Sequence, residues 1–345
     1  MASSSEGRGG VHGGLHRRSI VSALAGLGIV PGLAPELAFA QTLPNGGPAS
    51  PPGEPETGTL IGRKDRTTRL TTKVMINDTG PYEFVVDTGA NRSVISEELA
   101  VKLQLPPGSP AMVHGIAGVQ PAGTVNVRSF KAGVIDIPVR DIPVLKTFDL
   151  GADGLLGIDA FRDRAVTLDF ARNLVQISRS SYNGFHEYAR TTAAVTSDVT
   201  VTAKQRFGQL TIVDAEASKA KITCFVDSGA QRTVGNMAMR RAVLERTSDS
   251  GFAPIKVLIH GATGQDVPGE VALVPTMRVG GVHFTSFPMA FADLHTFKLW
   301  QLQDQPALML GMDLLRLFDL VAIDFGQRQV RFRLAELIDP TMARG

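Results

Sequence analysis

The sequence FVVDTGANRSV at residues 84–94 returns as CFVDSGAQRTV at residues 224–234. In each copy an apolar run of strand character leads into Asp-(Thr/Ser)-Gly-Ala, and a polar residue, Arg, a hydroxyl residue and Val follow. A carboxylate at the end of a buried strand is costly to keep there without a partner. A duplicated chain can bring its two copies, Asp87 and Asp227, together at a pseudo-twofold axis. There they would share a proton and become an acid and a base at once.

A third Asp-Thr-Gly triplet, at residues 78–80, serves as an internal control. Asn77 precedes it and Pro81 follows it, between two apolar runs. This composition is typical of a tight turn, because Gly tolerates positive φ and Pro cannot join a strand ladder. We expect a hairpin tip here rather than a site. The duplicated context therefore carries the signal, and the triplet alone does not.

The duplication extends over three further blocks that keep the same order in both halves of the chain. Such self-similarity is the sign of an internal repeat, and it predicts two homologous lobes. The paired blocks are VHGIAG (113–118) with IHGATG (259–264), LLGIDAF (155–161) with MLGMDLL (309–315), and VTLDF (166–170) with VAIDF (321–325).

The order of these blocks resembles that of the retropepsin-like and pepsin-like aspartic protease superfamily over residues 69–334. Ala after each triplet is closer to the retroviral-type enzymes and their bacterial relatives than to pepsin. Retroviral enzymes build the site from two identical chains, whereas this chain is similar to a fused, single-chain version. The resemblance implies an all-β fold of two retropepsin-like β-barrel lobes, related by a pseudo-twofold axis with a cleft between them.

Two features depart from the family pattern. Ile158 and Met312 follow the Leu-Gly turns, where the retroviral proteases usually place Arg. Pepsin's flap carries a tyrosine, whereas no tyrosine of this chain lies in a flap-like stretch; they are Tyr82, Tyr182 and Tyr188. Both departures concern the positioning of substrate, and neither touches the two aspartates.

The resemblance implies that Asp87 and Asp227 are the catalytic pair. One carboxylate takes a proton from the attacking water, while the other, protonated, hydrogen-bonds the oxygen of the peptide carbonyl. The sequence does not assign the shared proton to either residue, because coupled titrations belong to the pair.

Four neighbours are expected to support this pair. By family resemblance, Thr88 and Ser228 reach across the axis and hold the opposite loop. Gly89 and Gly229 let the two loops approach one another without clashes between Cβ atoms.

The two glycine-rich hairpins contain His114-Gly115 and His260-Gly261. Family resemblance places a flap over the substrate here, so these four residues are candidates for substrate binding. Two roles stay open for the histidines: a hydrogen bond to the peptide backbone, or an ordinary place on the surface of a hairpin. Neither histidine has a neighbouring ligand at metal spacing, so we expect no metal and no other cofactor.

Short runs rich in β-branched residues, separated by Gly and Pro, predict a mainly β chain. Clear strand signals lie at residues 70–76, 174–177 and 330–334, and helical ones at residues 97–103 and 237–244. Four further aspartates recur in both halves, and we expect them to hydrogen-bond at helix starts and strand ends rather than to catalyse; they are Asp159, Asp169, Asp313 and Asp324.

The N-terminal 40 residues have the features of an export signal. Paired arginines, Arg17 and Arg18, precede an apolar run at residues 20–33 that is too short to span a bilayer comfortably. Ala38-Phe39-Ala40 then matches the small-x-small pattern of a signal-peptidase site. The paired arginines resemble a twin-arginine signal, with Sec export as the alternative. We expect a periplasmic or secreted protein with no stable membrane insertion after signal cleavage.

The remaining chain divides by composition and repeat. A spacer rich in Pro and Gly is predicted at residues 41–66, followed by lobe 1 at 67–180, an interlobe linker at 181–205 and lobe 2 at 206–345. The linker is polar, and its sequence is compatible with either a strand or a loop. Because one chain carries both lobes, we expect a monomer.

The composition of the 345 residues narrows the classes of partner. A formal net charge of +2 gives no electrostatic reason to bind nucleic acid. The single cysteine, Cys224, excludes an intrachain disulfide and is expected to be a small apolar filler of the core.

The sequence thus predicts an aspartic endopeptidase that acts on a polypeptide substrate, either in general degradation or as a regulatory periplasmic protease. The rival hypothesis is a catalytically inactive peptide-binding module of the same fold. A degenerate site usually loses one aspartate, whereas both Asp87 and Asp227 are present here.

Overall fold

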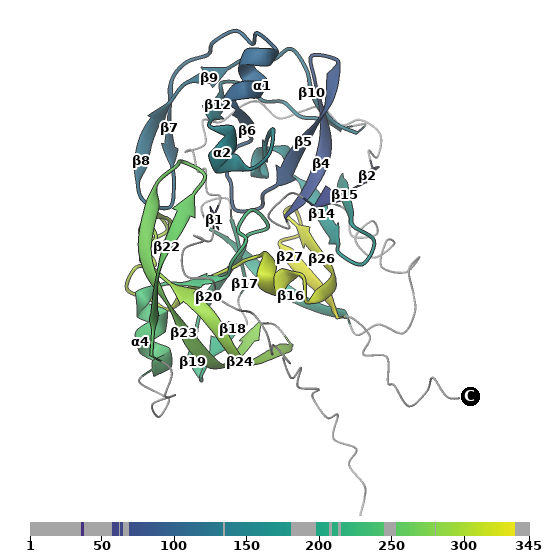
Figure 1. The fold of residues 1–345 in the computed structure, drawn as a ribbon. Coiled ribbons are helices and arrows are strands. Elements are labelled where there is room, and N and C mark those ends of the chain that lie inside the picture. Colours follow the sequence, from purple (N-terminus) through teal and green to yellow (C-terminus); the bar gives the residue numbers. More distant parts are fainter. Residues whose placement is uncertain are drawn as a thin grey trace, which may run out of the picture.

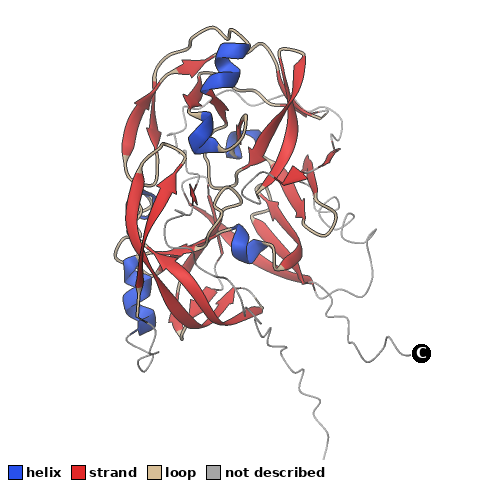
Figure 2. Ribbon diagram, viewed as in Figure 1, coloured by secondary structure: helices blue, strands red, loops and turns tan. Residues whose placement is uncertain are grey.

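The computed structural model describes residues 36–37, 57–61, 63–64, 69–133, 135–180, 198–206, 209–212, 215–244, 253–279 and 281–334. Strands form most of this chain, with short helices at some of their ends (Figure 2). They gather into two lobes, which lie one above the other in Figure 1. The predicted all-β fold with two homologous lobes is confirmed.

Lobe 1 is built on a sheet in the order β11-β10-β4-β5-β13-β6-β12-β9, with β3 beside β4. Its hairpin β7–β8, residues 111–122, forms a separate ladder and is called the lobe-1 flap below. The strands are β3 (Arg63–Lys64), β4 (Leu70–Ile76), β5 (Thr79–Val86), β6 (Val94–Ser96), β7 (Ala111–His114), β8 (Val119–Ala122), β9 (Thr124–Val125), β10 (Phe130–Ala132), β11 (Ile135–Asp136), β12 (Ile142–Leu145) and β13 (Gly154–Leu156). The helices are α1 (Glu97–Lys102), α2 (Thr147–Leu150) and the 3₁₀ turn η1 (Ile158–Ala160).

Lobe 2 repeats the central pairings of lobe 1. Its β20 runs parallel to β25 as β5 runs parallel to β13, and β21 lies between β24 and β25 as β6 lies between β12 and β13. Strand β22 and the first half of β23, residues 255–271, form the lobe-2 flap. The strands are β17 (Gln209–Ile212), β18 (Ala215–Ala217), β19 (Ala220–Lys221), β20 (Thr223–Val226), β21 (Val234–Gly235), β22 (Ile255–Gly261), β23 (Asp266–Val279), β24 (Val282–Phe291) and β25 (Ala307–Leu310). The helices are α4 (Met237–Leu244), α5 (His295–Leu299) and α6 (Met312–Leu315).

The two lobes are joined by one shared sheet in the order β2-β15-β14-β26-β27-β16. Strands β14 and β26 come from the same block of the two repeats and pair antiparallel, with Thr167 opposite its repeat equivalent Ala322 at the centre. The pseudo-twofold axis therefore passes between them. The strands are β2 (Thr57–Ile61), β14 (Arg164–Asp169), β15 (Leu174–Arg179), β16 (Asp198–Arg206), β26 (Phe318–Asp324) and β27 (Gln329–Leu334).

The shared sheet corrects two predicted boundaries. Residues 57–61 fall in the predicted spacer and 198–205 in the predicted interlobe linker, yet they form β2 and β16, which pair with the last strand of their own lobes. Both lobes thus begin earlier than residues 67 and 206. The predicted signal peptide lies outside the described residues, except for β1 (Glu36–Leu37), which runs parallel to β22.

Local sequence signals account for several elements. The control triplet lies at the β4–β5 hairpin, where Asn77 and Asp78 adopt positive φ of 48° and 63° and Ile76 pairs with Thr79. The predicted hairpin tip is confirmed. Helix α1 begins after Ser96, whose hydroxyl accepts the Leu99 N–H as an N-cap. The helices predicted at residues 97–103 and 237–244 are also confirmed, with α1 one residue shorter.

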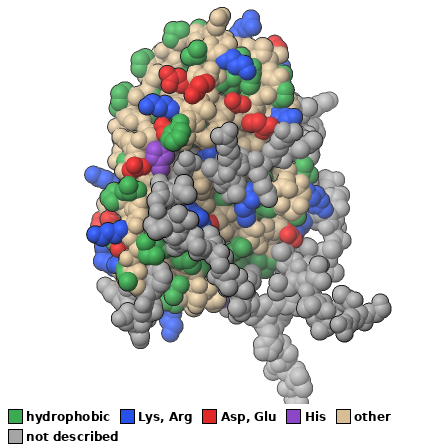
Figure 3. Space-filling view, in the orientation of Figure 1, with side chains coloured by type: hydrophobic (Ala, Val, Ile, Leu, Met, Phe, Trp, Pro, Cys, Tyr) green, Lys and Arg blue, Asp and Glu red, His purple; other side chains and the backbone are tan. Residues whose placement is uncertain are grey.

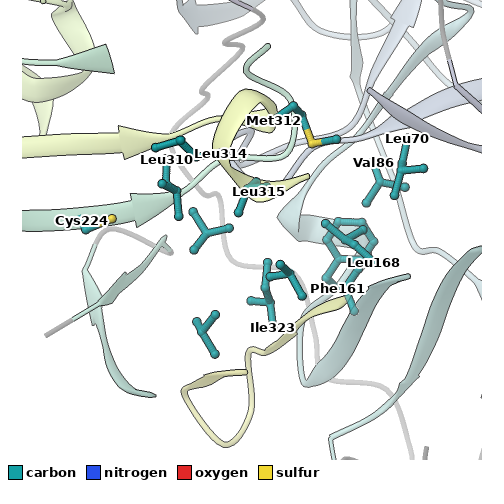
Figure 4. Close-up of a cluster of buried hydrophobic side chains, with 14 of the residues drawn as sticks. Leu70, Val86, Phe161, Leu168, Cys224, Leu310, Met312, Leu314, Leu315 and Ile323 are labelled. Atoms are coloured by element: carbon teal, nitrogen blue, oxygen red, sulfur yellow. The ribbon is translucent and has the colours of Figure 1, made fainter. Parts of the chain in front are cut away.

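The apolar runs that precede the two Asp-(Thr/Ser)-Gly motifs become strands buried on both faces, as continuous apolar runs in parallel pairs do. The side chains on one face of each strand join a core that continues from one lobe to the other through the shared sheet, whereas Val85 and Phe225 on the other faces belong to separate clusters. Figure 4 shows part of it, with Val86 and Leu168 of lobe 1 and Leu310 and Ile323 of lobe 2. Cys224 is fully buried in this core, which confirms its expected role as a filler.

Candidate active site

Asp87 and Asp227 follow the central strands β5 and β20 directly. The Asp87 N–H donates to the Leu156 carbonyl at 2.9 Å, and the Asp227 N–H donates to the Leu310 carbonyl at 3.0 Å. Each bond continues the parallel pairing of its lobe by one residue. The backbone on both sides of the axis is thus fixed by the sheet, so each carboxyl is presented to the other lobe from a rigid support.

The two carboxyl groups are held in the same way. Asp87 Oδ1 accepts the N–H groups of Gly89 and Ala90, both at 2.9 Å. Asp227 Oδ1 accepts those of Gly229 and Ala230, at 2.9 and 3.1 Å. Both side chains are fully buried, and each Oδ2 has no hydrogen-bond partner in the part of the chain that the structure describes.

The glycines of the two triplets permit the close approach of the loops. A Cβ atom at Gly89 would overlap the Asp227 carboxyl, and one at Gly229 would overlap the Asp87 carboxyl. Each aspartate therefore packs against the glycine of the opposite motif. This is the contact that the sequence predicted, and it explains why Gly follows the hydroxyl residue in both copies.

Thr88 and Ser228 connect the two loops across the axis. The Thr88 hydroxyl donates to the Val226 carbonyl at 3.0 Å, and the Ser228 hydroxyl donates to the Val86 carbonyl at 2.6 Å. In return, each hydroxyl oxygen accepts the backbone N–H of the other residue, at 3.1 and 3.0 Å. The structure thus places both residues where the family resemblance implied, in a network that satisfies every member.

Burial raises the pKa of both aspartates. It raises the pKa of Asp87 to about 6, against the lowering effects of the Gly89 and Ala90 N–H groups, the Arg69 charge and a contact with Asp227. Burial raises the pKa of Asp227 well above its usual value, and the negative charge of Asp87 raises it further. Two adjacent carboxyls that resist ionisation favour a state with one shared proton.

Behind each aspartate loop, the same set of hydrogen bonds joins a second aspartate, a hydroxyl residue and a glycine in both lobes. Asp159 Oδ1 accepts the N–H and hydroxyl of Ser93 at 2.8 and 2.7 Å, and the Ser93 hydroxyl oxygen accepts the Gly157 N–H. Asp313, Thr233 and Gly311 form the same network in lobe 2. The expected hydrogen-bonding role of Asp159 and Asp313 is confirmed. Sequence reasoning missed their partners, although the repeated Arg-(Ser/Thr)-Val was a visible signal.

The two flaps meet at their tips. Gly115 of the lobe-1 flap packs against the side chain of Thr263 in the lobe-2 flap, and Gly261 packs against Ile116 in return. A Cβ atom at either glycine would collide with the opposite tip. Gly115 and Gly261 thus allow the hairpins to interlock, a contact that no local sequence signal specifies.

The histidine of the lobe-2 flap reaches lobe 1. His260 Nε2 lies 3.0 Å from Asp149 Oδ1 of α2, and its Nδ1 lies 2.8 Å from Asp266 Oδ1 of its own flap. Partial burial lowers the pKa of His260, but the hydrogen bonds and charges of Asp266 and Asp149 outweigh this effect and raise it overall. Both ring nitrogens are therefore engaged by carboxylates.

The histidine of the lobe-1 flap contacts lobe 2, but its partner there is another histidine rather than a carboxylate. His114 Nδ1 lies 3.2 Å from His295 Nε2 at the start of α5, and the two rings stack. The His295 N–H also donates to the Ile116 carbonyl. Burial lowers the pKa of both histidines, and for His295 the charges of His114 and Lys298 lower it further. Each flap histidine thus contacts the opposite lobe, a role that neither sequence alternative included.

A pocket of about 540 Å³ opens beside the lobe-2 flap tip. It lies between β8, α2 and the flap, and Phe148 on its wall is 79% exposed. On the face shown in Figure 3, acidic and basic side chains are interspersed. Within the described ranges, no cluster of three potential metal ligands was found, and no helix is long and apolar enough to cross a membrane.

The sequence was also compared with known protein families and with curated proteins. A family model described as aspartyl protease matches residues 72–160 and 209–314. The two segments correspond to the two lobes, and each contains one Asp-(Thr/Ser)-Gly-Ala motif. A search of curated proteins gave no match to the chain.

Proposed function

The chain belongs to the aspartyl protease family, and on that premise we propose that it is an aspartic endopeptidase whose catalytic pair is Asp87 and Asp227. One observation carries the proposal. The two carboxyls meet at the pseudo-twofold axis, each with Oδ1 anchored by two N–H groups and Oδ2 buried without a partner in the described chain. A shared proton between the two carboxyls relieves the cost of that burial.

The geometry supports a general acid–base mechanism. The ionised carboxylate takes a proton from a water molecule as that water attacks the peptide carbonyl. The protonated carboxyl hydrogen-bonds the carbonyl oxygen and stabilises the charge that develops on it. The proton gained by the first aspartate then passes to the leaving amine. The fixed backbone of β5 and β20 keeps both groups oriented throughout these steps.

The competing function is a peptide-binding module without catalysis. A binding module has no need for two carboxyls that share a proton, nor for the loops to be tied by Thr88 and Ser228. Maintaining two buried acids opposes folding, because each resists ionisation. The intact pair and its hydrogen bonds therefore favour the catalytic function.

We further propose that the enzyme acts after export, in the periplasm or outside the cell. The paired arginines, the short apolar run and Ala38-Phe39-Ala40 support this proposal. Expression with native residues 1–40 in a bacterial host should yield an exported protein whose first residue is Gln41. Replacement of Arg17 and Arg18 by Lys should block export if the twin-arginine route is used. An intact N-terminus on protein retained inside the cell would contradict the proposal.

Activity itself can be tested with a diverse peptide mixture. The mature chain is incubated with the mixture across a range of pH, with and without pepstatin, and the products are identified by mass spectrometry. We expect internal cleavages that pepstatin suppresses. Peptides that bind the protein but stay uncut at every pH would instead support the binding module.

A further inference from the structure

The repeat symmetry of the site is broken at one position beside the aspartates. In lobe 1, Thr71 of β4 pairs with Val85 of β5, and continuing this register by two residues places Arg69 opposite Asp87. In lobe 2, Thr211 of β17 pairs with Phe225 of β20, and the same step places Gln209 opposite Asp227.

These two positions are equivalent in the two lobes. Residues directly opposite one another in an antiparallel pair lie on the same face of the sheet, so Arg69 is a cross-strand neighbour of Asp87. One of them carries a permanent positive charge, and the other carries none.

Arg69 is held in the interior of lobe 1. Its side chain is buried, and its guanidinium donates a hydrogen bond to the Leu150 carbonyl at the end of α2. A Cβ atom at Gly151, the residue that caps the C-terminus of α2, would lie 2.9 Å from the guanidinium Nη2. The backbone at this end of α2 therefore packs closely against the guanidinium group. A nearby negative charge favours a buried cation, and ionised Asp87 supplies such a charge.

We propose that Arg69 is a positioning residue that keeps Asp87 the ionised, water-activating member of the pair, whereas Asp227, opposite the uncharged Gln209, holds the shared proton. This inference rests on the proposed function, because it assigns the two roles of the same catalytic pair. Asp87 then acts as the general base and Asp227 as the group that hydrogen-bonds the substrate carbonyl.

The charges around the pair agree with this assignment. The positive charge of Arg69 lowers the pKa of Asp87, while the negative charge of Asp87 raises that of Asp227. The first proton is therefore lost from Asp87.

The first test separates the charge of Arg69 from its structural contact. Arg69→Gln removes the charge and introduces the residue found at the equivalent position of lobe 2. Arg69→Lys keeps the charge but removes the guanidinium group. We expect the acid limb of the kcat/KM profile to rise by about one pH unit in Arg69→Gln, because an adjacent cation depresses a carboxyl pKa by this order. Arg69→Lys and the exposed control Arg162→Gln should keep the acid limb of the wild type. Equal loss of activity at every pH in Arg69→Gln would overturn the proposal.

The second test reads the carboxyls themselves and does not depend on activity. The full chain, labelled with ¹³C at the aspartate carboxyl carbons, is titrated by NMR, and signals are assigned with Asp87→Asn and Asp227→Asn. We expect Asp87 to ionise before Asp227 in the wild type. The double variant Arg69→Gln/Gln209→Arg moves the positive charge from lobe 1 to lobe 2. In this variant Asp227 should ionise before Asp87.

Each result of the titration decides the inference. Ionisation of Asp227 first in the wild type would overturn it, as would an unchanged order in the folded double variant. If circular dichroism shows that the double variant does not fold, the titration of Arg69→Gln alone tests the inference. In that variant the difference between the pKa values of Asp87 and Asp227 must become smaller. If the protein cuts no peptide but Asp87 still ionises before Asp227, the result contradicts the proposed function and supports the proton assignment.

Discussion

Thr88 and Ser228 exchange hydrogen bonds across the pseudo-twofold axis, each donating its hydroxyl to the opposite lobe. Thr88→Val or Ser228→Ala leaves buried backbone groups unpaired, which costs about 1–3 kcal/mol of unfolding free energy for each variant. Urea unfolding of the two single variants and the double variant measures this cost. Because the residues share one network, the double variant should lose less than the sum of the singles. Strictly additive losses would show that the two hydroxyls act independently.

The raised pKa values of the aspartates predict a bell-shaped dependence of activity on pH. One carboxyl must be ionised, so activity falls as the pH drops below the value of about 6 for Asp87. The other must stay protonated, so activity falls again when Asp227, whose pKa is raised further, loses its proton. Steady-state cleavage assays at constant ionic strength measure both limbs. A rate that climbs steadily from about pH 5 to about pH 9 would indicate a different mechanism.

The contact between His260 and Asp149 should hold the lobe-2 flap against lobe 1 most strongly at low pH. Asp149 and Asp266 raise the pKa of His260, so the folded state favours its charged form, and this stabilisation is lost as the pH rises through that pKa. Hydrogen exchange of residues 255–271, corrected for intrinsic rates, should therefore be faster at pH 8 than at pH 5. His260→Ala should remove this difference.

The lobe-1 flap offers the matched control for this experiment. His114 and His295 face one another, and both pKa values are lowered, so their contact favours the neutral forms and weakens as the pH falls. Exchange of residues 111–122 should show the opposite pH trend, and His114→Ala should abolish it. The same trend in both flaps would contradict this account of the two contacts.

Much of this molecule could be predicted from the sequence because its signals are local and occur twice. Repeated apolar runs ending in Asp-(Thr/Ser)-Gly specify the central strands and the aspartates, and the turn residues around Asn77 specify a hairpin. Strand β2 was assigned to the spacer because Gly58 and its neighbours carry no strand periodicity, and the strand forms through its pairing with β15. For the predicted linker the sequence left a strand or a loop open, and residues 198–205 form the strand β16, in which Val and Thr alternate at residues 199–202.

Contacts between each flap and the opposite lobe could not be predicted in the same way. Asp149 and His260 are far apart in the chain, and nothing in either local sequence indicates the other. The same holds for His114 and His295, which the fold alone brings together. No local sequence signal marks Arg69, and the register of β4 and β5 places it opposite Asp87.

The fused arrangement predicts that the mature protein is complete as a monomer. Each lobe contributes one aspartate, one flap and half of the central sheet, so no second chain is needed to build the site. Specific activity should stay constant through a dilution series monitored by light scattering. A chain that ends at Ser180 lacks Asp227 and should be inactive. Collapse of activity on dilution, together with a dimeric mass at active concentrations, would contradict this prediction.

The central claim is that Asp87 and Asp227 together catalyse peptide hydrolysis, and paired substitutions test it most directly. The measurement is the cleavage rate of one peptide, identified from the mixture, by Asp87→Asn, Asp227→Asn and the matched control Asp78→Asn from the turn triplet. Circular dichroism confirms that each variant is folded. We predict a loss on the order of 100-fold or more for each site variant, because each lacks one positioned acid or base, and a rate near wild type for the control. Turnover close to wild type by either folded site variant would contradict the account.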